Sequence, residues 1–151
     1  MNKKELMESF YEAFSKGDWK TMNSFYADNT TFTDSIFKGL NHEQVTAMWK
    51  MLLENNEDMS VEFTIIEDND DFKVNWIVTY KFGPKRRKVI NSVLASFEIE
   101  NDKIVKHKDE FNFYKWSKQS LGLVGFLFGW TKWFNKKVGV GALEKINSNI
   151  K

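Results

Sequence analysis

The chain has 151 residues, which is long enough for one domain with a substantial core and too short for two ordinary domains. Hydrophobic residues make up 42% and charged residues 28%, which excludes an intrinsically disordered chain. With 22 Lys and Arg against 21 Asp and Glu, and with no cysteine, the sequence excludes disulfides and thiolate catalysis and carries no net charge that would favour nucleic acid.

The first part of the chain predicts a tight pair of helices. Apolar residues recur at three- and four-residue spacing over residues 6–14, and Gly17 stands where a left-handed C-cap would end that helix. Asp18 is expected to cap a second, short helix whose apolar side runs from Trp19 to Tyr26.

A short strand and a third helix are predicted next. Residues 30–34 are β-branched and alternate in polarity, so they favour a strand with Asp34 at its end. Asn41 and Gln44 have the spacing of a capping box, and the helix that they begin would bury apolar residues between 45 and 53.

From Met59 the hydrophobic period changes to two, which predicts an antiparallel meander. Its strands are expected at 59–67, 72–82, 88–100 and 103–114, with turns at 68–70, 83–85 and 101–102. Because helices precede strands instead of alternating with them, the pattern predicts an α+β fold with the helices on one face of the sheet.

Beyond Tyr114 comes an extension over about residues 115–151 in which a glycine-broken apolar stretch precedes a predicted helix. The main interpretation is that this extension packs over the domain or onto a second subunit. The alternative is a membrane-surface anchor, because aromatic residues beside lysines suit the membrane interface. The anchor residues would be Leu123, Phe126, Leu127, Phe128, Trp130, Trp133 and Phe134, followed by Lys136 and Lys137.

Neither a membrane span nor an export signal is expected. The most apolar window, 121–130, covers about ten residues with three glycines, whereas a bilayer-spanning helix takes about 20 residues. Residues 1–6 lack the apolar core and cleavage site of a signal peptide, so a cytoplasmic location is expected.

The order of elements resembles the nuclear transport factor 2-like superfamily, which includes ketosteroid isomerases and SnoaL-like polyketide cyclases. In element order the likeness covers about residues 3–114, and in sequence it is strongest over 17–39, above all in the segment 25–34. Residues 109–117 resemble an uncharacterised bacterial subgroup. The resemblance implies a single cone-shaped domain over 1–151, with N-terminal helices packed on a strongly curved antiparallel sheet, a C-terminal helical extension and a homodimer formed through the outer face of the sheet.

The resemblance also places Asp34 at the position of the general base of the isomerases. Those enzymes need an oxyanion hole as well, and its matching positions here hold Phe10 and Leu94, neither of which donates a hydrogen bond. Loss of a single such donor commonly costs about a hundred- to a thousand-fold in rate, so steroid isomerase activity is not expected. Epoxide hydrolase activity is not expected either, since Arg86 and Arg87 fall at a hairpin turn.

Asp34, His107 and Asp109 remain as candidate groups for acid–base catalysis. The alternatives are that Asp34 is a turn acceptor at a strand end and that His107 and Asp109 form a buried hydrogen-bonded pair. Aromatic residues make up 16% of the chain, more than a core of this size needs, and some are expected to line an apolar pocket. The candidate ligand-binding residues, each of which can equally be core, are Phe10, Phe14, Phe32, Trp49, Trp76, Tyr80, Leu94 and Phe111.

The sequence shows no metal-ligand spacing, phosphate loop or nucleophile elbow, so no metal and no cofactor are expected. The leading hypothesis is an enzyme that uses proton abstraction to isomerise, dehydrate or cyclise a small hydrophobic molecule. A non-catalytic ligand carrier and an association module that uses the extension are the alternatives.

Overall fold

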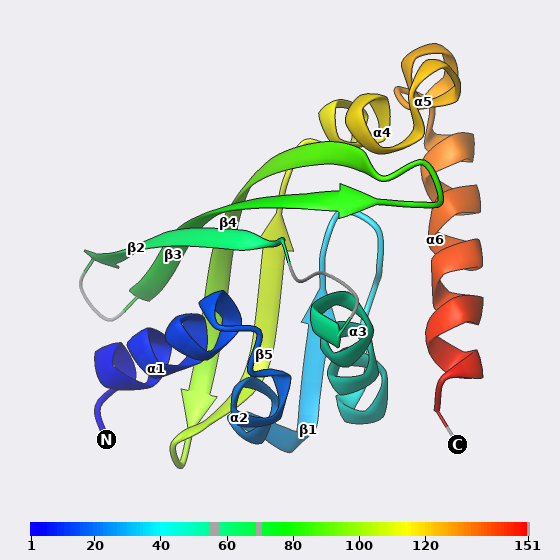
Figure 1. Ribbon diagram of the computed structural model, residues 1–151. Helices are drawn as coiled ribbons and strands as arrows, with labels where there is room; N and C mark the ends of the chain where they lie inside the picture. The colour runs from blue at the N-terminus through cyan, green and yellow to red at the C-terminus, as the bar shows by residue number, and fades with distance from the viewer. Residues whose placement is uncertain (55–57, 69–70, 151) are drawn as a thin grey trace.

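The computed structural model describes residues 1–54, 58–68 and 71–150. Its elements in chain order are α1 (Lys3–Ser15), α2 (Trp19–Ser24), β1 (Tyr26–Thr33), α3 (His42–Glu54), β2 (Ser60–Asp68), β3 (Asp71–Phe82), β4 (Arg87–Glu100), β5 (Lys103–Glu110), α4 (Phe113–Leu121), α5 (Leu123–Phe128) and α6 (Lys132–Ser148). Figure 1 shows α1, α2 and α3 against one side of a curved sheet, α6 beside α3, and α5 at the upper tip of the molecule.

The predicted helix ends are confirmed by the side chains that cap them. Gly17 adopts a φ of 71°, a left-handed conformation that suits glycine, and Asp18 accepts a hydrogen bond from the Thr21 amide at the start of α2. Asn41 and Gln44 bind each other's backbone amides at 2.9 and 3.0 Å, which is the expected capping box of α3.

The sheet has the strand order β1-β5-β4-β3-β2. Strands β2 to β5 form the predicted antiparallel meander, whereas β1 pairs with β5 in parallel. Asn101 and Asp102 both have positive φ, as the tight turn between β4 and β5 requires. The predicted turn at 68–70 lies mainly outside the described residues.

Two predicted boundaries are wrong. Tyr26 begins β1 and does not continue α2, so the first strand is longer than predicted. The last strand ends at Glu110, not near residue 114, because Asn112 accepts a hydrogen bond from the Lys115 amide and caps α4. Alternating apolar residues over 111–113 resemble strand continuation, and the cap overrides that local pattern.

The core lies between α1–α3 and the inner face of the sheet. Val74, Trp76, Val78 and Tyr80 of β3 are buried there, as the period-two pattern predicts. On β5 the register shifts where it pairs with β4, and Ile104 is fully buried.

The extension packs partly over the domain. Ile146 of α6 is buried, Asn135 donates to the Ser35 carbonyl at 2.9 Å, and Gln44 of α3 donates to Asn147 at 3.1 Å. The close approach of α6 leaves no room for a side chain at position 139, where a Cβ would lie 2.7 Å from the Ile36 carbonyl oxygen.

Candidate functional site

Asp34 follows the last residue of β1 and closes a tight turn. Its Oδ1 accepts hydrogen bonds from the amides of Ile36 and Phe37, both at 2.7 Å, and its own amide donates to the Phe37 carbonyl. The turn-acceptor interpretation of Asp34 is therefore present in the structure. Both amides bind the same oxygen, and within the described part of the chain Oδ2 has no hydrogen-bond partner.

The environment of Asp34 changes its acidity. Removal of the carboxyl group from water raises its pKa from the ordinary 3.8 to about 7, the two backbone amides oppose that rise, and the charge of Asp109 adds to it. A carboxyl group with a pKa near neutrality can both accept and return a proton under physiological conditions.

His107 and Asp109 form the centre of a buried chain of hydrogen bonds. His107 Nε2 lies 2.8 Å from Asp109 Oδ1, and His107 Nδ1 lies 2.7 Å from the Tyr26 hydroxyl oxygen. Trp49 Nε1 donates to the same hydroxyl oxygen at 2.9 Å. All four side chains are at most 5% exposed. The buried pair therefore exists, and Tyr26 and Trp49 extend it across the cone.

The hydrogen-bond donors in this series of side chains fix the direction of each hydrogen bond. The Trp49 indole can only donate, so Tyr26 accepts from it and is free to donate its own hydrogen to His107 Nδ1. His107 then carries its proton on Nε2 and donates it to Asp109. Every donor in the chain is satisfied in this arrangement, which stabilises one tautomer of the histidine.

Asp34 lies at the Asp109 end of this chain. The preceding strand residues pair as Phe32 with His107 and Thr33 with Lys108, so the strand register continues toward Asp34 and Asp109 as neighbours. The same end holds Tyr80, whose hydroxyl oxygen accepts from Trp116 Nε1 at 2.8 Å. Burial raises the pKa of Tyr80, and the Asp34 charge contributes to that rise.

Tyr11 was missed as a site residue because the sequence comparison assigned the matching position to Phe10. Both residues are buried, but the Tyr11 hydroxyl has no hydrogen-bond partner in the described residues, nor does Trp76 Nε1. The two rings lie 6.2 Å apart. Burial raises the pKa of Tyr11 well above its usual range, and the Asp109 charge raises it further. Together with the Thr30 hydroxyl, the Tyr11 hydroxyl and Trp76 Nε1 are the buried side-chain donors without a partner among the described residues.

Three of the eight predicted ligand-binding residues contact His107. Phe10 and Phe32 contact its ring edge-on at 5.9 and 4.8 Å, and Trp49 stacks at 6.4 Å. Phe14 packs on Trp49 and Trp76. Aromatic rings thus occupy the space around the histidine, with Phe97, which the sequence did not single out, closest at 4.3 Å.

Leu94 does not belong to this group. It lies between Val93 and Ala95, which are buried on the inner face of β4, so strand alternation directs Leu94 to the outer face. Leu94 therefore does not point into the cone, where the resemblance placed the second oxyanion position. Phe111, just beyond β5, is half-buried against the core.

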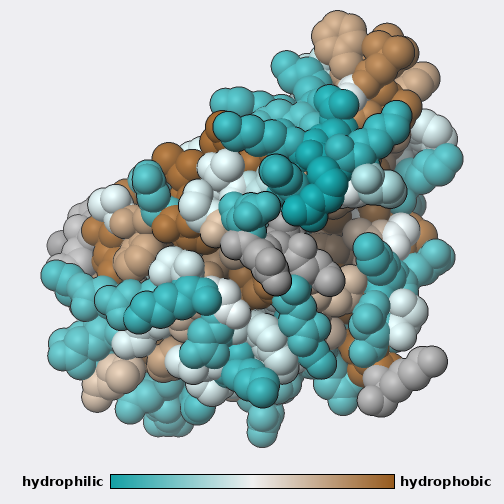
Figure 2. Space-filling model, viewed as in Figure 1, coloured by the Kyte–Doolittle hydropathy of each residue, from teal (hydrophilic) through white to brown (hydrophobic). Residues whose placement is uncertain are grey.

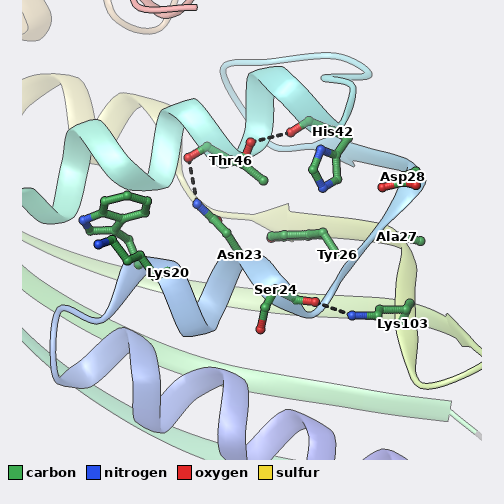
Figure 3. Close-up of a pocket in the computed structure, with 10 residues that line it drawn as sticks. Lys20, Asn23, Ser24, Tyr26, Ala27, Asp28, His42, Thr46 and Lys103 are labelled. Atoms are coloured by element: carbon green, nitrogen blue, oxygen red, sulfur yellow. Dashed lines mark hydrogen bonds between the residues drawn. The ribbon is translucent and has the colours of Figure 1, made fainter.

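A surface hollow lies elsewhere, between α2, α3 and β1. It has a volume of about 630 Å³, is open to solvent and is lined by Trp19, Lys20, Asn23, Ser24, Tyr26, Ala27, Asp28, His42, Thr46 and Lys103. Figure 3 shows that Asn23 donates to the Thr46 carbonyl and Lys103 to the Ser24 carbonyl, while the Thr46 hydroxyl donates to the His42 carbonyl within α3. Tyr26, which lines this hollow, also binds His107 and Trp49 in the buried hydrogen-bond network.

No group of three His, Cys, Asp or Glu that could hold a metal ion occurs among the described residues.

Residues 7–107 match the model of the SnoaL-like domain family. Similar solved structures include a candidate polyketide cyclase from Xanthomonas campestris pv. campestris, at 15% identity and a TM-score of 0.66, covering 77% of this chain and 94% of that one. A protein from Catenulispora acidiphila with a ketosteroid isomerase-like fold, in complex with trimethylamine, has 13% identity and a TM-score of 0.65 over 77% of this chain and 92% of that one.

An epoxide hydrolase from Mycobacterium tuberculosis of the LEH-like type shares 20% identity, with a TM-score of 0.59, over 82% of this chain and 92% of that one. At these identities the likeness shows the fold alone. The comparison with proteins of curated function gave no match.

Proposed function

Because the chain belongs to the SnoaL-like domain family, within the nuclear transport factor 2-like superfamily, we propose that its cone binds a small hydrophobic molecule and that Asp34 exchanges a proton with that molecule. The observation that carries the proposal is the Asp34 carboxyl group, with a pKa of about 7 and an oxygen left without a partner.

The unpaired donors support a ligand that carries an acceptor oxygen. The Asp109 charge raises the pKa of both Asp34 and Tyr11, so one carboxylate influences both groups. A carbonyl or hydroxyl oxygen near Tyr11 and Trp76 would satisfy two buried donors, and negative charge that develops on it would be stabilised there. Tyr11 thereby replaces the donor that the sequence comparison sought at Phe10.

The reaction class that these groups suit is proton abstraction next to a carbonyl, without a cofactor. Asp34 would take the proton, and the enolate oxygen would accept a hydrogen bond from Tyr11. Return of the proton to another carbon would complete an isomerisation, whereas in a cyclisation the enolate carbon would bond to a second carbonyl carbon, whose oxygen would take the proton. The hydrogen-bonded side chains His107, Tyr26 and Trp49 would hold Asp109 in place beside Asp34.

Deuterium exchange at the carbon next to the carbonyl of a bicyclic aryl ketone tests this proposal. The protein should accelerate exchange, and Asp34→Asn should lose at least about a hundred-fold of that acceleration. Tyr11→Phe should also lower the rate, whereas Tyr114→Phe, whose hydroxyl binds the Phe126 carbonyl in the extension, should not. Equal rates for the protein and Asp34→Asn would overturn the catalytic proposal.

A non-catalytic ligand carrier is the second candidate, and the aromatic packing around His107 favours it. Native mass spectrometry of freshly purified protein would then show a bound hydrophobic molecule in stoichiometric amount. Exchange activity that Asp34→Asn abolishes would count against this candidate.

The expected homodimer also remains a proposal. Ile77 and Ile90 are exposed on the outer face of the sheet, at 43% and 46%, and would be covered by a second copy of the chain. Sedimentation equilibrium of the protein and of Ile77→Lys distinguishes a dimer formed through that face from a monomer.

A further inference from the structure

The short helix α5 has an unusual distribution of side chains. Its large apolar residues point outward, and its small residue points inward. Gly125 is buried against α4, and a Cβ there would overlap the Ser117 carbonyl group. A Cβ on Gly129 would likewise overlap the Ser117 side chain. Glycines therefore form the packed side of this helix, which leaves its larger apolar side chains without a place in the core.

Seven large apolar side chains between 123 and 133 are exposed. They are Leu123 (71%), Val124 (51%), Phe126 (55%), Leu127 (50%), Phe128 (46%), Trp130 (72%) and Trp133 (63%), here called the apolar tip. Figure 2 shows brown apolar residues gathered at the upper right of the molecule, where Figure 1 places α5. The predicted anchor differs at two positions, since Phe134 is buried and Val124 is exposed. So large a continuous apolar surface commonly marks a docking site.

The charges around the apolar tip have one sign. Between Glu110 and Glu144 the chain has five lysines and no acidic residue, and all five lysines are exposed. The turn that precedes β4 adds four cations, Lys85 to Lys88, and lies beside α4 because Arg87 Nε donates to the Gln119 carbonyl at 2.9 Å. The chain has 22 Lys and Arg in total, so outside this end 13 basic residues stand against 21 acidic residues. Although the net charge is close to zero, the end of the molecule that carries the apolar tip is basic and the rest is acidic. Asp58, 3.9 Å from Arg86, is the acidic partner in the ion pair found at this end among the described residues.

We propose that the apolar tip inserts into the headgroup region of a membrane that contains anionic lipids, while the surrounding lysines and arginines bind the lipid phosphates. A second protein would cover a stripe on one side of a helix, whereas the apolar tip is exposed on every side except the glycine side. Trp130 and Trp133 lie beside Lys132 and Lys137, and Lys137 Nζ stands 5.1 Å from the Trp133 ring centroid. Tryptophan with lysine is the residue pair that membrane interfaces favour.

The depth of insertion is limited by the fold. Among the described residues, none of the helices is long and apolar enough to cross a membrane. An interfacial contact needs only the tip, which is held firmly on α4 by Gly125 and by a hydrogen bond from the Tyr114 hydroxyl to the Phe126 carbonyl. The contact is independent of what the cone binds.

Vesicle flotation of the full chain tests the proposal. The probes are vesicles of phosphatidylcholine alone and of phosphatidylcholine mixed with phosphatidylglycerol. We expect binding to the anionic vesicles, weakened by salt, and little binding to the neutral ones. Replacing Phe126, Leu127 and Trp130 together with serine should lower the partition constant by at least about ten-fold. Each of Lys132→Gln and Lys136→Gln should lower it by about five-fold on the anionic vesicles.

The matched control is Val140→Ser, which removes an exposed apolar side chain from α6 outside the apolar tip and should leave vesicle binding unchanged. Absence of binding to the anionic vesicles, or an equal loss in the control, overturns the proposal. A third result would also overturn the proposal: the protein binds neither kind of vesicle, forms a dimer in sedimentation equilibrium, and the serine variant at the tip dissociates that dimer. A second copy of the chain, and not a membrane, would then cover the tip.

Discussion

Replacing Asp34 with asparagine should stabilise the protein at and above neutral pH and leave its stability unchanged in acid. Asparagine keeps an oxygen that can accept from the amides of Ile36 and Phe37, so the turn after β1 is retained. The substitution removes only the negative charge that burial penalises. Its effect therefore separates the turn role of this residue from the cost of its ionisation.

The sign and the size of the expected change in the free energy of unfolding both follow from the pKa of Asp34. Between the ordinary value of 3.8 and the folded value of about 7, the folded protein holds a proton that the unfolded chain has lost, so wild-type stability falls as pH rises through this window. The full difference corresponds to about 4 kcal/mol. Since Asp34 is only partly buried and water screens its charge, we expect the variant to gain about 1–3 kcal/mol above pH 7.

Urea unfolding from about pH 4 to about pH 8 measures this difference. Asp18→Asn is a control whose effect on stability should have the opposite sign. The hydrogen bonds from Thr21 lower the pKa of Asp18, so the charged side chain stabilises the fold above pH 3.8, and this contribution is lost in stronger acid. An Asp34→Asn variant that is no more stable than the wild type at about pH 8 would show that burial does not penalise this carboxylate.

The remaining predictions concern packing and hydrogen bonding. Tyr26→Phe leaves two buried polar groups unpaired and should lower the free energy of unfolding in urea by about 2–5 kcal/mol. Tyr80→Phe leaves one group unpaired and should lower it by about 1–3 kcal/mol, and equal losses would contradict the hydrogen bonds assigned to Tyr26. Gly125→Ala should displace α5 from α4, seen as faster proteolysis after residue 121 with little loss of global stability, and unchanged proteolysis would refute the tight contact. Val93→Ala should cost more stability than Leu94→Ala, measured the same way, and the reverse order would return Leu94 to the inner face.

Local patterns predicted the helices at the start of the chain and the meander because each rests on residues close in sequence. Gly17, Asp18 and the Asn41–Gln44 pair act over three to six positions, and the structure has each of them as expected. The end of β5 was mispredicted where two local preferences compete: alternating apolar residues favour a strand, and the Asn112 side chain favours a helix start.

The candidate site depended on contacts between distant residues, which periodicity does not contain. Period two placed His107 and Asp109 on one face, as the structure has them. Tyr26 reaches His107 only because β1 pairs with β5 in parallel, and no pattern in the sequence indicates that pairing. Tyr11 has helical spacing with the apolar residues of α1, so only its unpaired hydroxyl distinguishes it from core.

The two halves of the cone differ in how freely they can accept a ligand. On the β1 and β5 side, four side chains bind one another, and moving any of them would leave buried donors or acceptors unpaired. On the side of α1 and β2, Tyr11 stacks on Phe63 at 5.4 Å, and this phenylalanine is only half-buried and makes no hydrogen bond with its ring. Phe97 of β4 meets Tyr11 at 6.2 Å and also contacts His107, so it joins the two sides. Rotation of the Phe63 ring costs packing but no hydrogen bond. A ligand should therefore enter between α1 and β2 and meet the Tyr11 hydroxyl first.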